Sequence, residues 1–270
     1  MRQKRALGLG LCTAMLLAMA VAGSPVLAAS SATLAVPSWC PFNAAAPAMA
    51  QTAAFRRIAE KAARREMITL VAIGSSSTAG SDLSDPGLAY PTHLERHLNA
   101  LLGGQVVTVL NKGKGGEGVP ETVARFKRDV VALNPDLVVW QLGSNDIVRR
   151  ADPATTAKSV EDGMLELAMS GTPIVMMDTQ TAPAVAASPV LEQTQTLLKA
   201  AAVRHHALFW SRFELMRGIL ASRMASTDDL IKPDQLHMTV PMHVCTGKVL
   251  AEAIAVELGQ ISAEVISASR

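Results

Sequence analysis

The sequence predicts an α/β fold in which a parallel β-sheet is covered by helices on both faces. From Ile68 onward, short runs of β-branched and apolar residues alternate with longer segments of helical periodicity, and repeated strand–helix units form parallel sheets. The predicted strands are continuously apolar, which is typical of strands buried on both faces. With 270 residues, 49% of them hydrophobic, the chain can form one large core.

Five strand–helix units follow one another along the chain. The apolar runs predict strands at 68–73, 106–110, 137–142, 174–177 and 207–210. The helical period predicts helices at 90–102, 120–133, 155–169, 189–203, 212–224 and 241–258. Asp152-Pro153 and Ser188-Pro189 each have the pattern of an N-cap followed by proline at the first helical position. The Ala-rich segment 43–66, which carries a basic stripe, predicts one more helix before the first strand.

The first 28 residues have the pattern of a secretory signal peptide. Three basic residues stand within the first five positions, and residues 6–22 form an apolar run. Small or apolar residues precede Ala28, after which we expect cleavage. An uncleaved membrane anchor is the alternative, but a run of about 17 residues with two glycines is short for a span. We therefore expect a periplasmic or secreted protein with no membrane span after cleavage.

Charge excludes one class of partner. The chain has 25 basic and 23 acidic residues, and without the three basic residues of the leader the balance becomes 22 against 23. Nucleic-acid binding needs clustered basic side chains that follow the phosphates, whereas no contiguous basic run outside the leader is longer than a pair such as Arg56-Arg57 or Arg64-Arg65. Nucleic acid is therefore not an expected partner.

Cysteine usage predicts one disulfide. Cys12 leaves with the leader, so Cys40 and Cys245 remain as the pair in a chain bound for an oxidising compartment. We expect them to join the proline-rich N-terminal arm to the last helix, which in the chain-entropy model contributes about 4 kcal/mol of stability. Two unrelated buried thiols are the alternative.

Four segments with chemically active side chains stand at positions where parallel sheets usually have their ligand-binding and active sites. Three follow the first three predicted strands and the fourth precedes the last helix, at residues 74–80, 111–118, 142–146 and 233–237. Ligands of such sheets bind beyond the carboxyl ends of the strands. We therefore expect the functional site to lie among these segments.

Together the segments contain what serine attack on an acyl carbon requires: a hydroxyl, an imidazole, a carboxylate that orients it, and donors for the oxyanion. Asp234 and His237 are three residues apart and can pair locally, which leaves the second ring nitrogen free to face a serine of the first segment. Asn145 offers a side-chain amide and Gly116 an unobstructed backbone N–H. These residue types predict acyl transfer.

In this order the four segments resemble the motif blocks of the SGNH (GDSL-type) hydrolase superfamily. The resemblance implies a three-layer α/β/α, flavodoxin-like fold with a five-stranded parallel sheet, and ester or thioester hydrolysis without a metal or other cofactor. It implies that Ser76 attacks, that His237 acts as general base and then acid, and that Asp234 orients His237. The implied oxyanion hole consists of the backbone N–H groups of Ser76 and Gly116 and the amide of Asn145.

The resemblance covers residues 68–258 and departs from the family pattern at one position. The family usually shows Gly-Asp-Ser where this chain has Gly74, Ser75 and Ser76. The missing aspartate is not the nucleophile, so we expect altered support around Ser76 rather than a lost reacting group. The choice among Ser75, Ser76 and Ser77 depends on the alignment, and a serine here has an alternative role as a helix N-cap.

The sequence thus predicts a secreted or periplasmic serine esterase. We expect a signal peptide at 1–28, an N-terminal arm and helix at 29–66, an SGNH hydrolase-like domain at 67–262 and a tail at 263–270. The substrate stays open among an O-acetylated polysaccharide, peptidoglycan, a lysophospholipid and a thioester. The alternative function is a catalytically degenerate SGNH-like domain that binds acylated glycans or a protein partner.

Two further motifs point to cofactors. Gly113, Gly115 and Gly118 spell the dinucleotide fingerprint G-x-G-x-x-G, but two residues separate the strand from the first glycine and the next strand does not end in an acid. His93 and His97 stand four apart on a predicted helix and could share a metal, but a third ligand is missing, so we expect a solvated helix face. We predict neither a nucleotide nor a metal site.

Overall fold

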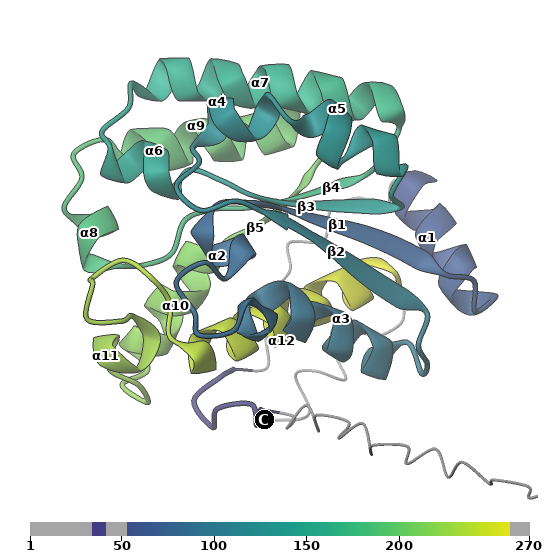
Figure 1. Ribbon diagram of the computed structural model, residues 1–270, viewed down its shortest axis with the longest axis horizontal. Helices are drawn as coiled ribbons and strands as arrows, with labels where there is room; N and C mark the ends of the chain where they lie inside the picture. Colours follow the sequence, from purple (N-terminus) through teal and green to yellow (C-terminus); the bar gives the residue numbers. More distant parts are fainter. Residues whose placement is uncertain (1–33, 42–52, 260–270) are drawn as a thin grey trace, which may run out of the picture. The chain divides into compact units, whose positions relative to one another are not determined.

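The computed structural model describes residues 34–41 and 53–259 (Figure 1). The predicted signal peptide at 1–28 and the predicted tail at 263–270 lie outside the described residues. Of the helices in the described ranges, none combines the length and the apolar character that crossing a bilayer requires.

The described residues form one five-stranded sheet, and all neighbouring strands run parallel. The strands are β1 (Ile68–Gly74), β2 (Val107–Gly113), β3 (Leu137–Gln141), β4 (Ile174–Met177) and β5 (Leu208–Trp210). Their order across the sheet is β2-β1-β3-β4-β5. Every residue of the central strand β3 is buried, which is the reason for the apolar run at 137–140. The predicted α/β fold with a five-stranded parallel sheet is confirmed.

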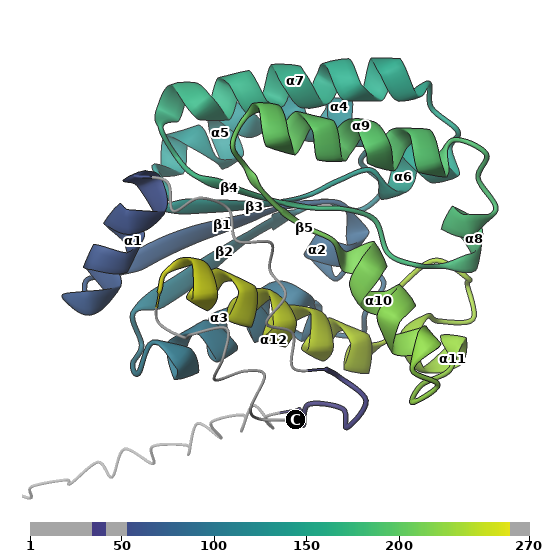
Figure 2. The ribbon, with the colours of Figure 1, turned by 180° about the vertical axis from the view of Figure 1, so that it is seen from behind.

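Helices cover both faces of the sheet, as Figures 1 and 2 show from opposite sides. One face carries α4 (Val119–Val123), α5 (Phe126–Asp129), α7 (Pro153–Ser170) and α9 (Leu191–Arg204). The other carries α3 (Tyr90–Leu101) and α12 (Val240–Glu257). Alternate side chains of β3 enter two separate cores: Trp140 packs with Met164 of α7, whereas Val139 belongs to the core that includes Leu250 of α12. This is the three-layer arrangement.

The remaining helices flank these layers. They are α1 (Ala53–Ala63), α2 (Ser76–Ala79), α6 (Ser144–Val148), α8 (Pro183–Ala186), α10 (Arg212–Ala221) and α11 (Thr227–Leu230), with 3-10 turns at Pro86–Leu88 and Val131–Leu133. The one-turn helices α2, α6, α8 and α11 were not predicted, because a single turn carries too few residues for a helical period.

Two predicted helices differ in the structure. The helix predicted at 120–133 is broken, because Arg125 leaves the helical region (φ −113°, ψ 6°) while its buried guanidinium reaches Glu117 at 2.7 Å and the Gly74 carbonyl at 3.2 Å. The helix predicted from Pro189 begins only at Leu191, because the Ser188 hydroxyl donates to a distant carbonyl and does not cap it. The predicted cap Asp152 is confirmed, since it accepts the Thr155 N–H at 2.8 Å.

Cys40 and Cys245 form the predicted disulfide, with their Cα atoms 5.6 Å apart. The arm at 34–41 is held at two further points, because Lys248 of α12 donates to the Pro41 carbonyl at 3.3 Å and Arg96 of α3 donates to the Leu34 carbonyl at 3.4 Å. The bond and these contacts fasten the arm to the two helices of one face.

We expect reduction of the disulfide to lower the melting temperature. A loss of about 4 kcal/mol corresponds to roughly 10 °C in a domain of this size, and the Cys40→Ser, Cys245→Ser double variant is expected to match the reduced protein. Catalysis is expected to weaken as well, because Cys245 lies eight residues after His237. Calorimetry of the oxidised, reduced and double-variant proteins measures the shift. Two titratable thiols in the untreated protein would contradict the bond.

The prediction that His93 lies on a solvated helix face is wrong, and His97 is half-buried. His93 is a residue of α3 that packs against α12, and its Nε2 forms a hydrogen bond with the Leu88 carbonyl at 3.2 Å. His243 of α12 is fully buried, and its Nδ1 accepts the Tyr90 N–H at 3.2 Å. Burial lowers the pKa of His93 and of His97 to about 4, and that of His243 to about 3.

These buried histidines make the fold sensitive to acid. Between about pH 6.5 and the lowered pKa, the unfolded chain binds protons that the folded protein does not, so each such histidine removes about 1.4 kcal/mol per pH unit as pH falls. We expect the His243→Asn variant, which keeps an acceptor for the Tyr90 N–H, to lose stability less steeply than the wild type by about that amount. Urea unfolding from pH 7.5 to 4.5 measures both slopes, and parallel slopes would contradict the assignment.

Candidate active site

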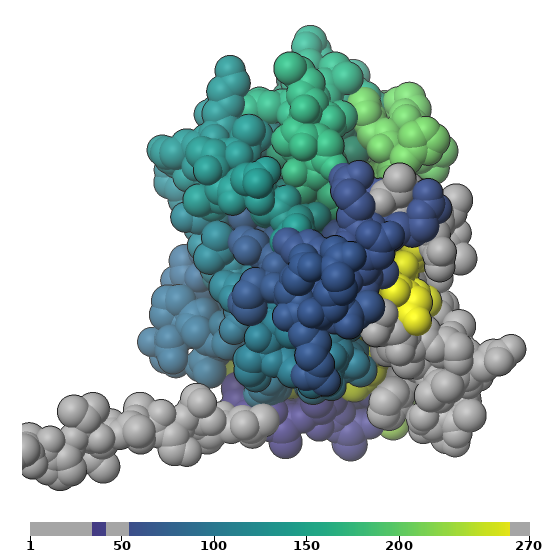
Figure 3. All heavy atoms as spheres, turned by 90° about the vertical axis from the view of Figure 1, so that its right-hand side faces the viewer, coloured from purple at the N-terminus to yellow at the C-terminus, as the bar shows by residue number. Residues whose placement is uncertain are grey.

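The segments after β1, β2 and β3 meet the loop before α12 at one end of the sheet, where Figure 1 shows α2, α6 and α8. The opposite end is the one viewed in Figure 3, where α1 lies in front. Ser76 is the first residue of α2, which follows β1 directly and ends after one turn at Gly80 (φ 69°). The site therefore forms at the carboxyl ends of the strands, as parallel sheets favour.

Ser76, His237 and Asp234 form a continuous row of hydrogen bonds. Ser76 Oγ lies 3.0 Å from His237 Nε2, and His237 Nδ1 lies 2.7 Å from Asp234 Oδ2. A carboxylate only accepts, so the ring proton resides on Nδ1 and the lone pair of Nε2 faces the serine. The structure thus brings together three residues that the sequence analysis assigned to one set, two of them 161 positions apart.

The carboxylate of Asp234 is fixed by the loop that carries it. Partial burial favours its neutral form, but hydrogen bonds from the backbone N–H groups of His237 (2.9 Å) and Leu236 (3.0 Å) and from the His237 ring outweigh this and hold the pKa of Asp234 below its usual value. Asp234 therefore stays ionised at neutral pH and keeps the imidazole in one orientation.

The loop at 231–239 is a tight hairpin. The Lys232 N–H donates to the His237 carbonyl at 2.8 Å and the Thr239 N–H to the Leu230 carbonyl at 2.9 Å. Lys232 Nζ also reaches the Asp82 carbonyl at 2.6 Å and its carboxylate at 3.3 Å. This cation ties the loop of His237 to the segment that follows α2.

Gly116 and Asn145 lie on adjoining segments. Asn145 Nδ2 donates to the Glu117 carbonyl at 2.7 Å, and Arg149, the residue that follows α6, donates to the Gly116 carbonyl. Gly116 has φ 81°, the left-handed region that favours glycine. Among the described residues, the backbone N–H groups of Ser76 and Gly116 have no hydrogen-bond acceptor. Both remain available to a ligand.

The glycines of the G-x-G-x-x-G pattern serve close packing. A Cβ on Gly113 would lie 2.1 Å from the Ala79 nitrogen, and one on Gly118 would lie 2.7 Å from Asp146 Oδ1. Asp146 accepts the Val119 N–H at 3.1 Å, and burial raises the pKa of this carboxyl. The loop of Gly116 is thereby pressed against α2 and α6.

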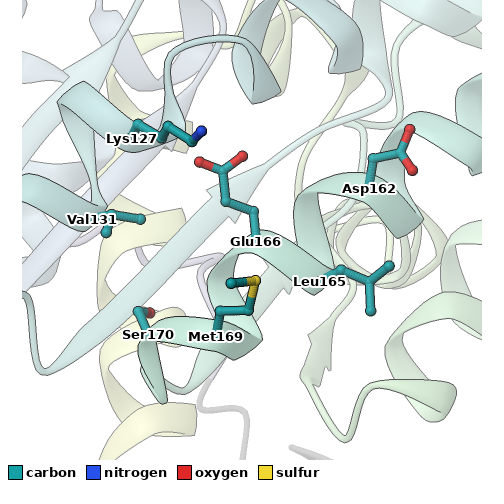
Figure 4. A pocket seen from close by; sticks show the side chains of 7 residues that line it. All are labelled: Lys127, Val131, Asp162, Leu165, Glu166, Met169 and Ser170. Atoms are coloured by element: carbon teal, nitrogen blue, oxygen red, sulfur yellow. The ribbon is translucent and has the colours of Figure 1, made fainter.

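Two hollows lie outside the triad itself. One, of about 490 Å³, adjoins Gly116, and its lining includes the charged residues Lys114, Glu121 and Arg128. The other, of about 550 Å³, lies between α7 and the segment 127–131 (Figure 4); its lining is Lys127, Val131, Asp162, Leu165, Glu166, Met169 and Ser170. Only the first borders the site.

Three residues that support the site were not predicted from the sequence. Gln141 could have been recognised in the sequence, since it is the polar residue that ends the apolar run of β3. Arg149 stands four residues after Asn145, but the one-turn helix that aligns them has no recognisable period. Lys232 contacts Asp82 across 150 positions, and nothing in the local sequence predicts such a contact.

The three-layer fold and the order of the segments at its strand ends define the chain as a protein of the SGNH hydrolase superfamily. It belongs to the non-GDSL lipase-like family, whose model matches residues 41–260. The description of the family as non-GDSL agrees with the sequence Gly-Ser-Ser, in place of Gly-Asp-Ser, at residues 74–76. No curated protein sequence matches the chain significantly.

Several solved structures share the fold. Axe2, an acetylxylan esterase from Geobacillus stearothermophilus, is 23% identical with a TM-score of 0.58, over 72% of this chain and 95% of its own. LAE5, an α/β hydrolase from the metagenome of Lake Arreo, is 23% identical with a TM-score of 0.59, over 72% and 96%. CEX, a two-domain esterase active on acetylated mannans, is 19% identical with a TM-score of 0.64, over 77% and 54%. At these identities the likeness establishes the fold.

Proposed function

We propose that the protein is a serine esterase in which Ser76 is the nucleophile, His237 the general base and acid, and Asp234 the residue that orients His237. The observation that carries the proposal is the row of hydrogen bonds from Ser76 through His237 to Asp234, at 3.0 and 2.7 Å. Membership of a lipase-like family supports ester hydrolysis as the reaction.

In the first half of the reaction, Ser76 Oγ attacks the acyl carbon while His237 Nε2 takes the hydroxyl proton. The carbonyl oxygen becomes an oxyanion, and Asp234 stabilises the imidazolium. When the C–O bond of the ester breaks, His237 returns the proton to the departing alcohol. Water then attacks the acyl-enzyme with His237 again as base, which releases the carboxylic acid and restores the Ser76 hydroxyl.

The oxyanion is held by the backbone N–H groups of Ser76 and Gly116 and by the side-chain amide of Asn145. Asn145 uses one amide hydrogen to bond the Glu117 carbonyl, which leaves its second hydrogen for the substrate. Donors fixed before the reaction need no reorientation as charge develops, which is the source of their catalytic effect.

We further propose esters of hydrophilic alcohols, such as acetylated polysaccharides, as the substrate class. The hollow beside Gly116 supports this, because its walls carry Lys114, Glu121 and Arg128 and suit a hydroxyl-rich alcohol better than a long acyl chain. Fold relatives named as esterases of acetylated xylan and mannan lend further support.

We also propose that the protein works in the periplasm or outside the cell. The bond between Cys40 and Cys245 supports this location, since disulfides persist in oxidising compartments. The signal-peptide pattern of the first 28 residues is the second support.

A series of p-nitrophenyl esters from acetate to palmitate tests the activity and the substrate class together. We expect kcat/KM to be highest for acetate and to fall with chain length, and we expect the protein to release acetate from acetylated xylan or mannan. A preference for palmitate would overturn the substrate class and retain the esterase. No turnover of any ester would favour the non-catalytic binding domain.

A further inference from the structure

We propose that Gln141, the last residue of β3, is a positioning residue that holds the turn carrying Ser76. The inference rests on the proposed function, because the placement of Ser76 matters for catalysis only if Ser76 reacts. It also accounts for the serine at position 75, where the superfamily usually has aspartate.

One side-chain oxygen accepts hydrogen bonds from both sides of Ser76. Gln141 Oε1 lies 2.9 Å from the Ser75 nitrogen, 3.0 Å from Ser75 Oγ and 3.2 Å from Thr78 Oγ1. All three residues are buried, with exposed fractions of 5% or less. The Ser75 N–H can only donate, so it requires the oxygen of the amide to face the turn. Gln141 thereby clamps the residue before Ser76 and the residue two positions after it.

Gly74 leaves room for this clamp. A Cβ at position 74 would lie 2.7 Å from the Gln141 carbonyl oxygen and 2.8 Å from Gln141 Oε1. Any other residue would push the end of β1 away from β3. Gly74 therefore allows the amide of Gln141 to approach the backbone of the turn that carries Ser76.

Ser75 and Gln141 are chemically matched. An ionised aspartate at position 75 has acceptors only, so its carboxylate would face Gln141 Oε1 as one acceptor against another. Turning the amide around would present its NH₂ group to the backbone N–H of residue 75, which is donor against donor. A serine, which can donate, fits the oxygen of Gln141 where the aspartate does not.

The clamp continues toward the acid–base loop. Gln141 Nε2 lies 3.5 Å from Ser144 Oγ, Ser144 Oγ donates to Gln180 Oε1 at 2.9 Å, and Gln180 Nε2 donates to the Leu236 carbonyl at 3.0 Å. Leu236 directly precedes the triad histidine. A buried chain of polar side chains thus links the turn of the nucleophile to the loop of its base.

The test replaces Gln141 by methionine, which keeps the length of the side chain and removes its acceptor. We expect kcat for p-nitrophenyl acetate to fall by about 10- to 100-fold with KM changed by less than about 2-fold, because a small displacement of the nucleophile slows attack without altering substrate binding. The rate at which a fluorophosphonate labels Ser76 is expected to fall by the same factor. Gln141→Glu, which retains an acceptor oxygen, is expected to keep most of kcat.

Asn99→Leu is the matched control. Asn99 is also a buried amide with three hydrogen bonds, to Val106 N, Val107 N and the Val107 carbonyl, near the opposite end of the sheet. We expect it to destabilise the fold comparably and to leave kcat unchanged. Ser75→Asp is expected to lower kcat as Gln141→Met does. If Gln141→Met does not fold, Ser75→Asp takes its place in the comparison with Asn99→Leu.

Amide hydrogen exchange of the segment 74–79 supplies a readout that does not depend on activity. We expect faster exchange there in Gln141→Met and in Ser75→Asp than in the wild type and in Asn99→Leu. Wild-type exchange and wild-type kcat in both variants would overturn the clamp. A wild type that neither hydrolyses esters nor reacts with the fluorophosphonate would overturn the proposed function instead, while the exchange result would still decide the role of Gln141.

Discussion

Ser76→Ala is expected to lower kcat for ester hydrolysis by about 10⁴- to 10⁶-fold, because it removes the atom that forms the acyl-enzyme. The hydroxyl of Ser76 bonds His237 Nε2 and the side chain is only partly buried, so we expect the melting temperature to stay within about 2 °C of the wild type. Initial rates with p-nitrophenyl acetate and a thermal melt measure the two quantities.

The neighbouring serines are the controls for this assignment. Ser75→Ala removes one of the three hydrogen bonds to Gln141 and leaves the backbone bond in place, so most activity is expected to remain. Ser77→Ala is expected to retain most activity as well. Mass spectrometry of the fluorophosphonate adduct should locate the label on Ser76. Near-wild-type turnover by Ser76→Ala would show that another serine is the nucleophile.

Asn145→Ala is expected to lower kcat by about 10²- to 10³-fold with little change in KM, since the amide acts on the oxyanion that forms only in the transition state. Asn145 also bonds the Glu117 carbonyl, so its removal loosens the loop of Gly116. Steady-state kinetics with p-nitrophenyl acetate separates kcat from KM.

Arg149→Met distinguishes the two roles of Asn145. Arg149 holds the same loop through the Gly116 carbonyl but supplies no donor to the oxyanion. We expect this variant to lose less than about 10-fold in kcat. Equal losses in the two variants would mean that Asn145 only supports the loop, and an effect confined to KM would remove it from the oxyanion hole.

The sequence by itself determined the fold class and the identity of the segments at the strand ends. Strands buried on both faces are mainly apolar, and this local property is readable in the runs that form β1, β3 and β4. The pairing of Asp234 with His237 was equally accessible, because residues three apart in one loop can bond without help from the rest of the chain. The bond between Cys40 and Cys245 was predicted from the signal-peptide pattern, because export to an oxidising compartment would favour a disulfide between them, and the structure contains this bond.

Only the tertiary structure decided the features that depend on long-range contacts. The helix predicted at 120–133 is interrupted where Arg125 turns inward to Glu117 and the end of β1. His93, which was expected on a solvated helix face once a metal site had been set aside, is buried because α12 packs against α3. Gln141 reaches the nucleophile turn because β1 and β3 are neighbours in the sheet. In each case the residue's environment is made by a segment far away in sequence, so local patterns could not reveal it.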